Sequence, residues 1–207
     1  MKNTKIIFAT KNKGKLKEIK KIMSDKYEIL SIEDAGIDIE IIEDGKTFEE
    51  NALKKACSVM RQCNEIVLAD DSGLEIDYLD KAPGIYSARY MGENTPYEVK
   101  NKKILELLEG VEEDKRTARF VCVIAASIPD YGTVTVRETI EGIIGYDIKG
   151  VNGFGYDPIF YLPERKKTTA ELSMDEKNEI SHRGKALRKM KKKLNDIMEK
   201  SLWKHLL

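Results

Sequence analysis

Two adjacent carboxylates form the first candidate for chemistry in this chain. Asp70 and Asp71 follow the apolar stretch 66–69 and precede Ser72 and Gly73. Neighbouring side chains at the end of a strand point in different directions. One carboxylate can therefore ligate a hard cation while the other orients that ligand or accepts a proton from water. The alternative is an acidic turn in which Gly73 supplies the bend, since Asp and Gly are common in turns.

A lysine-rich loop between a strand pattern and a helix pattern is the second candidate. At such a junction, free backbone N–H groups and the positive end of a helix converge on one point. Lysine side chains add positive charge there, which suits a phosphate group. The alternative is a solvated turn that only connects two elements; the Walker A pattern GxxxxGK(S/T) is absent. The loop consists of Thr10, Lys11, Asn12, Lys13, Gly14 and Lys15.

The third candidate is the segment GFGYDP, which begins at Gly153. Gly153 and Gly155 allow the backbone to approach a ligand closely. Phe154 or Tyr156 could stack on a nucleobase, and Asp157 could accept a hydrogen bond from it. A turn whose aromatic side chains pack on the core is an equally good interpretation.

A cluster of donors near the C-terminal end is the fourth candidate. Lys177 is followed by the run Ser181, His182, Arg183 and Gly184. An adjacent His–Arg pair at a helix start can present several hydrogen-bond donors to a polar ligand. The alternative, which the residues alone favour, is a capped helix entrance with solvated charge.

Apolar periodicity predicts the elements that must position these residues. Residues 119–128 form the longest apolar run and are expected to be a central strand, paired with 133–144 through the turn 129–132. Strands and helices mix throughout, so we expect one α/β domain with a mixed sheet drawn out into two lobes. The other expected elements are strands at 5–9, 27–32, 66–69 and 74–78, and helices that begin near residues 16, 47, 95, 173 and 184.

Capping signals mark three of these helix starts. The signals are Thr47 with Glu50, Thr95 with Pro96 and Glu98, and Ser173 with Glu176. The last helix, 184–200, is amphipathic and is expected to bury Leu187, Met190, Leu194 and Ile197.

The composition restricts the classes of function. The 207 residues carry 36 Lys+Arg and 36 Asp+Glu, a net charge of zero. That balance argues against bulk attraction to nucleic acid, although a local basic pocket for one small anion remains compatible with it. No apolar run approaches the roughly 20 residues of a membrane span, and the N-terminal apolar stretch is too short for a signal peptide. Cys57, Cys63 and Cys122 form no CxxC motif, so a reduced, cytoplasmic protein is expected.

Taken together, the four candidate segments resemble the inosine triphosphate pyrophosphatases, which cleave aberrant purine nucleoside triphosphates such as ITP, dITP and XTP. The similarity extends from Ile7 to about Met190. DDSGL with PGIYSARY, and SHRGKAL, are highly specific in combination. The matching blocks, in the family's order, are FATKNKGKLKEI, EDGKTFEENALKKA, LADDSGLEIDYLDKAPGIYSARY, GFGYDPIF and AELSMDEKNEISHRGKAL.

The resemblance implies an elongated α/β fold in which a single domain, residues 1–207, has two lobes and a central nucleotide cleft. It also implies a homodimer and Mg²⁺-dependent hydrolysis between the α- and β-phosphates, which releases the nucleoside monophosphate and pyrophosphate. Such an enzyme would keep these nucleotides out of DNA and RNA.

The resemblance also assigns roles to the candidate residues. The loop from Thr10 to Lys15 would hold the triphosphate, and Lys55 would add positive charge to it. Glu43 and Asp71 match magnesium ligands, and Asp71 is also the expected proton acceptor. From the adjacency of the two acids we further hypothesise that Asp70 positions the metal or the water. The nucleotide contacts would be Ser72, Phe154, Gly155, Tyr156, Asp157, Lys177, His182 and Arg183. Lys11 departs from the family pattern, where a small residue is common, and its charge could alter phosphate affinity.

Two alternatives remain open from the sequence. One is a related pyrophosphatase with a different base preference, for example for modified pyrimidines. The other is a protein that binds nucleotides or RNA without hydrolysing them. Glu43, Asp70 and Asp71 argue against the second, because a pure binder gains little from acids beside phosphates.

Overall fold

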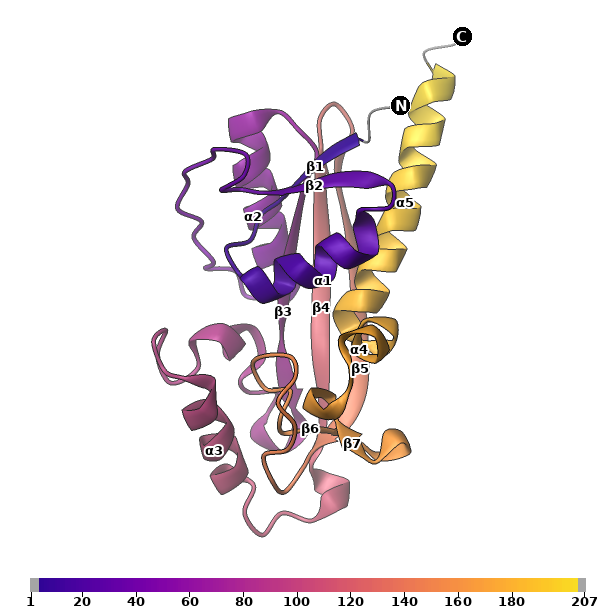
Figure 1. Ribbon diagram of the computed structural model, residues 1–207. Helices are drawn as coiled ribbons and strands as arrows, with labels where there is room; N and C mark the ends of the chain where they lie inside the picture. The colour runs from indigo at the N-terminus through magenta and orange to yellow at the C-terminus, as the bar shows by residue number, and fades with distance from the viewer. Residues whose placement is uncertain (1–3, 205–207) are drawn as a thin grey trace. The chain divides into compact units, whose positions relative to one another are not determined.

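The computed structural model describes residues 4–204 and is built around a mixed sheet (Figure 1). The described residues form seven strands in the order β2-β1-β3-β4-β5-β6-β7. β1 pairs in parallel with β2 and β3, whereas β6 pairs antiparallel with β5 and β7. The expected mixed sheet is therefore confirmed. The strands are β1 Thr4–Phe8, β2 Tyr27–Ser31, β3 Val67–Ile76, β4 Thr117–Ile128, β5 Gly132–Ile144, β6 Phe160–Leu162 and β7 Lys167–Thr168.

Five α-helices accompany the sheet within the described residues. They are α1 Lys13–Met23, α2 Phe48–Cys63, α3 Tyr97–Leu107, α4 Met174–Ile180 and α5 His182–Lys204. Short 3₁₀ helices include η1 Asp77–Leu79 and η2 Gly84–Arg89, both between β3 and α3. Leu187, Met190 and Leu194 of α5 are fully buried, as the amphipathic pattern predicts, and Ile197 is half-buried.

The chain divides into two compact units, and the boundaries fall inside continuous elements. Unit 1 comprises residues 1–71, 123–137 and 184–207, and unit 2 comprises 72–122 and 138–183. The boundaries interrupt β3, β4 and β5 as well as α5. The expectations of a single domain and of a nucleotide cleft stay predictions.

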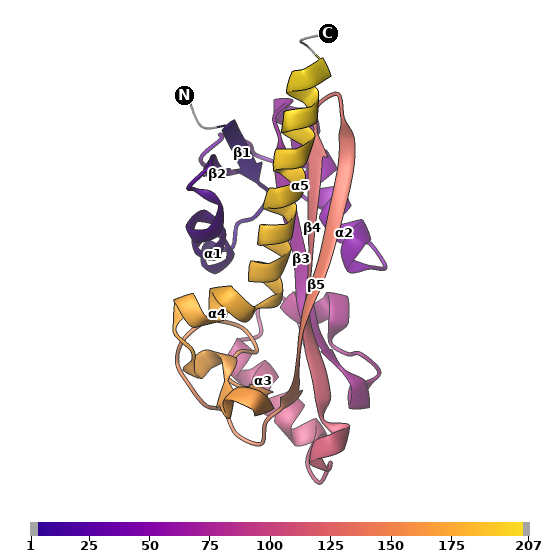
Figure 2. The same ribbon diagram turned by 90° about the vertical axis from the view of Figure 1, so that its right-hand side faces the viewer.

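Unit 1 is layered. α2 covers one face of its part of the sheet, and α1 and α5 cover the other (Figures 1 and 2). Ile6, Phe8 and Leu68 on the strands and Ala52, Ala56 and Val59 on α2 are fully buried. The parallel pairing of β1 places Ile7 opposite both Leu30 and Val67. Strands buried on both faces explain why 5–9 and 66–69 read as continuous apolar runs.

β3 corrects one expectation about the carboxylate segment. The sequence suggests a strand that ends at Asp70, followed by a second strand from Leu74, with a turn as one reading. The structure instead has one continuous strand, Val67–Ile76, through the pair of carboxylates. The acidic-turn alternative is therefore wrong, because the backbone of Gly73 stays extended within a sheet.

Helix capping follows the sequence signals fully at α4, in part at α2, where Glu50 accepts a bond from Lys46 N instead of Thr47 N, and not at α3. Ser173 and Glu176 form the complete capping box of α4, and Thr47 Oγ1 accepts a bond from Glu50 N at the start of α2. The predicted cap at Thr95 is wrong, because Thr95 Oγ1 donates to Met91 O at 2.7 Å instead. Pro96 takes the N-cap position of α3 without a side-chain bond.

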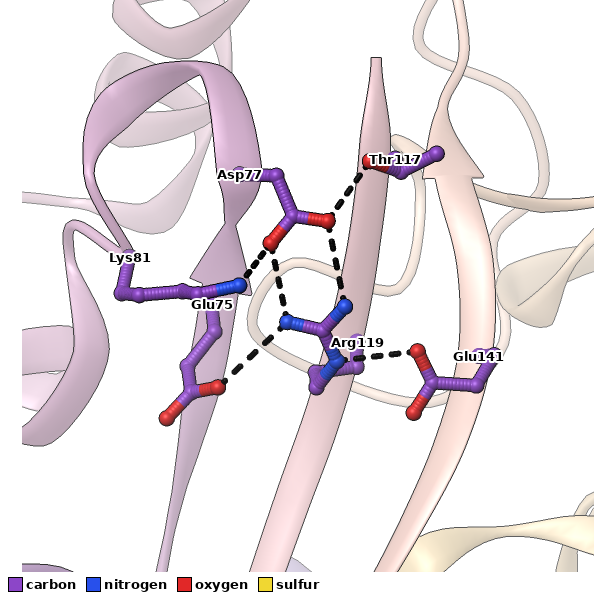
Figure 3. Close-up of polar contacts among 6 residues, drawn as sticks. All are labelled: Glu75, Asp77, Lys81, Thr117, Arg119 and Glu141. Atoms are coloured by element: carbon purple, nitrogen blue, oxygen red, sulfur yellow. Dashed lines mark hydrogen bonds and ion pairs between the residues drawn. The ribbon is translucent and has the colours of Figure 1, made fainter. Parts of the chain in front are cut away.

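Unit 2 has its own apolar core and a polar network on its strands. The core includes Leu74, Ile104, Phe120 and Phe160. In the network, Asp77 accepts bonds from both terminal nitrogens of Arg119, from Thr117 and from Lys81 (Figure 3). Arg119 also contacts Glu75 of β3 and Glu141 of β5. These contacts join three adjacent strands, β3, β4 and β5.

The structure bears on two expectations from the sequence, the absence of a membrane span and the absence of disulfides. No helix among residues 4–204 is long and apolar enough to cross a membrane. None of the three cysteines, all of which lie in this range, forms a disulfide. The residues at the extreme N-terminus, 1–3, lie outside the described part, so the absence of a signal peptide stays a prediction.

Candidate active site

α1 begins inside the lysine-rich loop, at Lys13, with Asn12 as its N-cap. Asn12 Oδ1 accepts a hydrogen bond from Lys15 N at 3.0 Å, and Thr10 Oγ1 accepts one from Asn12 N at 3.1 Å. The first turn holds no acidic residue, so no carboxylate on α1 neutralises the positive end of its dipole. The strand–loop–helix junction is confirmed, with Gly14 in the first helical turn. Its suitability for phosphate stays a prediction.

Asp70 and Asp71 diverge, as their adjacent places on β3 require. Asp70 is 1% exposed, and its Oδ2 lies 2.8 Å from Lys15 Nζ. Lys15 therefore links the start of α1 to one carboxylate of the pair, while Lys11 and Lys13 are exposed.

Asp71 belongs to a second cluster that α2 positions. Lys55 Nζ lies 3.3 Å from Asp71 Oδ1 and 3.2 Å from Glu43 Oε2. Asn51, one turn earlier on α2, donates from Nδ2 to Asp71 Oδ2 at 3.3 Å. Asn51 and Lys55 lie four residues apart and so share one face of α2. The structure brings both residues to the same carboxylate.

The opposite charges of Lys55 and the nearby carboxylates attract each other, and this attraction opposes the effect of burial on their pKa values. Burial works against the Lys55 cation, but Asp71, Asp70 and Glu43 together hold the pKa of Lys55 above its usual value. Burial raises the pKa of Asp71, and the nearby Lys55 and Lys15 only partly oppose that effect. A carboxylate with a raised pKa is a stronger base, which suits a proton acceptor.

The donor set fits a magnesium ion that phosphates help to hold. The described residues contain no group of three or more His, Cys, Asp or Glu side chains arranged to hold a metal by themselves. Glu43 and Asp71 nevertheless converge on one cationic atom, Lys55 Nζ. Mg²⁺ is commonly bound through one or two carboxylates together with substrate phosphates and water. Two converging carboxylates, with oxygen as the only donor type, agree with that chemistry.

The GFGYDP loop of unit 2 is anchored by its own aspartate. Asp157 is 2% exposed, and its Oδ2 accepts from Phe154 N and from Lys177 Nζ, both at 2.7 Å. Its Oδ1 accepts from Thr169 Oγ1 at 2.8 Å. A Cβ at Gly153 would collide with this carboxylate, and φ there is +76°, so the loop needs glycine at that position. Asp157 thus shapes the loop, and a contact with the base stays a prediction.

Phe154 is the less buried of the two aromatic residues of the loop. It is half-buried, with Lys177 Nζ and Arg183 Cζ at 4.9 Å and 5.4 Å from its ring centroid. Arg183 Nη2 also donates to Ser72 Oγ at 3.0 Å. Four of the expected nucleotide-contact residues, from β3, the loop, α4 and α5, therefore lie together in unit 2.

Tyr156 packs inside unit 2 and is less suited to stacking on a base. It is 3% exposed, its hydroxyl donates to Ser87 O at 2.9 Å, and its ring meets Tyr97 edge-on at 5.3 Å. Burial raises its pKa. Gly155 O accepts from Asn101 Nδ2 at 3.1 Å. Tyr97 and Asn101 carry no sequence signal of their own, and Ser87 lies in the motif PGIYSARY without a role assigned from sequence, because only the fold brings η2 and α3 to this loop.

His182 is held by stacking. Its ring lies 4.9 Å from that of Phe120 with an interplanar angle of 18°, and it is 6% exposed. Phe120, an interior residue of β4, is a partner that the sequence could not identify. This placement orients the start of α5, where Arg183 follows.

Comparison with known proteins gives extensive matches. Residues 6–193 match the sequence model of the Ham1 family. The chain is 51% identical over 203 residues to the dITP/XTP pyrophosphatase of Clostridium perfringens, covering 94% of this chain and 99% of that protein. It is 50% identical over 189 residues to the dITP/XTP pyrophosphatase of Bacillus subtilis, covering 91% and 96%.

Solved structures give the same picture of the fold. The Ham1 protein of Staphylococcus aureus is 43% identical with a TM-score of 0.84, covering 93% of this chain and 99% of that one. The HAM1 protein of Coxiella burnetii is 40% identical with a TM-score of 0.85 and the same coverage.

Proposed function

Because the chain belongs to the Ham1 family, we propose that it hydrolyses non-standard purine nucleoside triphosphates, namely dITP, XTP and ITP. The products would be the nucleoside monophosphate and pyrophosphate. Two relatives about half identical over more than nine-tenths of this chain are named dITP/XTP pyrophosphatases. The reaction would remove these nucleotides from the pool before they enter DNA or RNA.

The convergence of Glu43 and Asp71 on one cation is the structural observation on which the proposal chiefly rests. We assign both carboxylates to a Mg²⁺ ion, which when bound supplies charge neutralisation and Lewis acidity at the phosphate oxygens. The triphosphate would be held by Lys55, Lys15 and the backbone N–H groups of α1's first turn. Thr10, Asn12 and Gly14 shape that turn, and Lys11 and Lys13 add charge near it.

Asp71 is the assigned proton acceptor for the attacking water. Its pKa is raised by burial, and a general base works best when its pKa approaches the working pH. Water would attack the α-phosphorus in line with the pyrophosphate leaving group. Asp70, held by Lys15 at 2.8 Å, would keep that lysine directed at the phosphates.

The residues around the GFGYDP loop are assigned to the nucleoside. Phe154 would stack on the base and add affinity without discrimination. Hypoxanthine and xanthine present an acceptor at O6, which suits the donors of Arg183, whereas adenine presents an amino donor there. With adenine, a donor of Arg183 would face the amino donor of the base, and the hydrogen bond that is not made would weaken binding by about 1–3 kcal/mol. Guanine shares O6 but carries a 2-amino group, so its exclusion must depend on a contact at position 2. Ser72, Lys177 and His182 are expected to orient Arg183 and Phe154.

A panel of nucleoside triphosphates with pyrophosphate detection tests this function. With Mg²⁺ present, dITP, ITP and XTP should give higher kcat/KM than ATP and GTP. Equal values across the panel would remove the purine assignment, and preference for a modified pyrimidine would replace it. Nucleotide binding without pyrophosphate release would identify a non-catalytic binder instead.

We further propose that the enzyme acts in the cytoplasm as a homodimer, as the family resemblance implies. The apolar stretch from Ala82 to Tyr90 is one candidate surface, and Tyr86 within it is 57% exposed. Light scattering on the purified protein should give twice the chain mass of 23.6 kDa. A monomer mass would contradict the assignment.

A further inference from the structure

The loop that carries Glu43 is attached to the start of α2 through its backbone. Gly45 N donates to Asn51 Oδ1 at 2.8 Å, and Lys46 N donates to Glu50 Oε2 at 2.7 Å. Glu50 thus reaches Lys46 rather than completing a capping box with Thr47. These contacts, all inside unit 1, fix the loop within two residues of Glu43.

Asn51 connects this loop to the strand that carries Asp71. It is 0% exposed, its amide oxygen accepts from Gly45 N, and its amide nitrogen donates to Asp71 Oδ2 at 3.3 Å. One partner requires an acceptor and the other a donor. Among side chains of this size, a neutral amide alone provides both at its two ends. The orientation of the amide group is therefore fixed by the two residues that it joins.

Gly45 is fitted to the same contact. A Cβ built on it would lie 2.5 Å from Asn51 Oδ1, 2.8 Å from Glu50 Cβ and 3.0 Å from Asn51 N. Any side chain at this position would push the loop away from α2. The close approach of Gly45 and the buried amide of Asn51 are thus two parts of one contact.

We propose that Asn51 is a positioning residue that sets the separation of the Glu43 and Asp71 carboxylates, and thereby the affinity of the site for a divalent cation. This rests on the proposed function in taking these carboxylates as the magnesium ligands. Lys55 holds both carboxylates through charge, but a flexible cation does not fix their distance. Asn51 fixes their distance through two directed hydrogen bonds, one with Gly45 N in the loop that carries Glu43 and one with Asp71 itself. Loss of such an outer partner typically weakens metal affinity about 10- to 100-fold.

The test compares two variants that break the contact from opposite ends. Asn51→Leu keeps a branched side chain but removes both hydrogen bonds. Gly45→Ala pushes the loop away from α2 without changing any residue of that helix. Lys54→Ala is the matched control. Lys54 lies on the same helix and contacts the same loop, but only through an exposed ion pair in which Lys54 Nζ lies 2.5 Å from Asp44 Oδ1. Mn²⁺ binding to the nucleotide-free protein by electron paramagnetic resonance, and the Mg²⁺ concentration that half-activates dITP hydrolysis, are the two readouts.

Both Asn51→Leu and Gly45→Ala should raise the Mn²⁺ dissociation constant and the half-activating Mg²⁺ concentration about 10-fold or more. Saturating Mg²⁺ should restore part of the lost turnover, because the ligands themselves remain, and Lys54→Ala should match the wild type in both readouts. Unchanged metal affinity in the two variants would overturn the inference. Should Asn51→Leu fail to fold, Gly45→Ala alone decides.

The outcome is separable from that of the proposed function. A wild type that releases no pyrophosphate from any purine triphosphate contradicts the function, while the Mn²⁺ comparison still tests the role of Asn51. Hydrolysis by the wild type, with equal metal affinity in all variants, contradicts only the role of Asn51.

Discussion

At the scale of single residues, the two adjacent carboxylates of β3 have separate partners. Asp70 is held by Lys15, whereas Asp71 faces Lys55 and Asn51. Asp70 therefore contacts a residue at the start of α1, and Asp71 contacts residues of α2. Substituting one or the other should have different effects on activity, although they are neighbours in the chain.

Asp71→Asn should lower kcat about 10²- to 10⁴-fold, because it removes the proposed proton acceptor. Asp70→Asn should cost less, since it only loosens Lys15. Pyrophosphate release at saturating Mg²⁺ measures both, and circular dichroism confirms folding. Near-normal turnover in both variants would refute the assignment.

Arg183→Lys should reduce discrimination between purines. The planar guanidinium contacts both Ser72 Oγ and the face of Phe154, and a lysine ammonium cannot make the two contacts at once. The ratio of kcat/KM for dITP over dATP should fall about 10-fold or more, in line with one lost hydrogen bond of about 1–3 kcal/mol. An unchanged ratio with a uniformly lower rate would show that Arg183 holds the loop but does not read the base.

At the scale of elements, the sequence predicts what depends on local signals and misses what depends on distant contacts. Ser173 with Glu176 fixes the start of α4, since both capping bonds are local. The same kind of signal predicts the wrong N-cap for α3. The N-cap is Pro96, one residue later than the predicted Thr95. β6 and β7, with three and two residues, are too short for any periodicity. β3 reads as two strands because Asp and Gly in its middle are typical of turns. The ion pairs of Asp70 with Lys15 and of Asp71 with Lys55 join distant residues, so no local pattern predicts them.

The Asp77–Arg119 network supports a prediction about pH and stability. Hydrogen bonds from Arg119, Lys81 and Thr117 hold the pKa of Asp77 well below its usual 3.8. A lowered pKa stabilises the fold above about pH 4, and that stabilisation is lost as pH falls toward the lower value. Asp77→Asn should reduce the free energy of unfolding by about 1–2 kcal/mol at pH 7, with a smaller difference at pH 3.

Urea unfolding at the two pH values measures this change. Glu98→Gln is the control, because the Glu98–Lys102 pair on α3 is exposed and should make no measurable difference. A gap between wild type and Asp77→Asn that grows as pH falls would contradict the argument.

α3 supports the GFGYDP loop from outside the site. Asn101 donates to Gly155 O, and the ring of Tyr97 lies within van der Waals reach of a Cβ at Gly155. Asn101→Ala should raise KM for dITP about 5-fold, as one lost hydrogen bond would, with kcat nearly unchanged. A fall in kcat at constant KM would show instead that the loop acts on the chemical step.

At the scale of the whole molecule, charge balance constrains the partners. With 36 basic and 36 acidic side chains, the protein has no net attraction to a polyanion. A mobility-shift assay with double-stranded DNA at 150 mM salt should therefore show no complex at micromolar protein. A shift that weakens with added salt would reveal a basic surface that the composition hides.

The strand order is the part of the whole that the sequence does not contain. Local patterns predict β1, β2, β4 and β5 nearly at their observed bounds. Nothing local places β1 between β2 and β3, since that order depends on which apolar faces meet. The resemblance of five motif blocks predicts the family. The structure then separates the half-buried Phe154 from Tyr156, which packs on Tyr97.

The unit boundaries inside β3, β4, β5 and α5 limit how this protein can be recombined. Neither unit is a continuous piece of the gene, so no single crossover with a homologous gene could exchange one unit and leave the other intact. A chimera that takes residues 72–122 and 138–183 from a relative would need four junctions, each within a strand or helix. We therefore expect recombination between related genes to exchange the whole coding sequence rather than one unit.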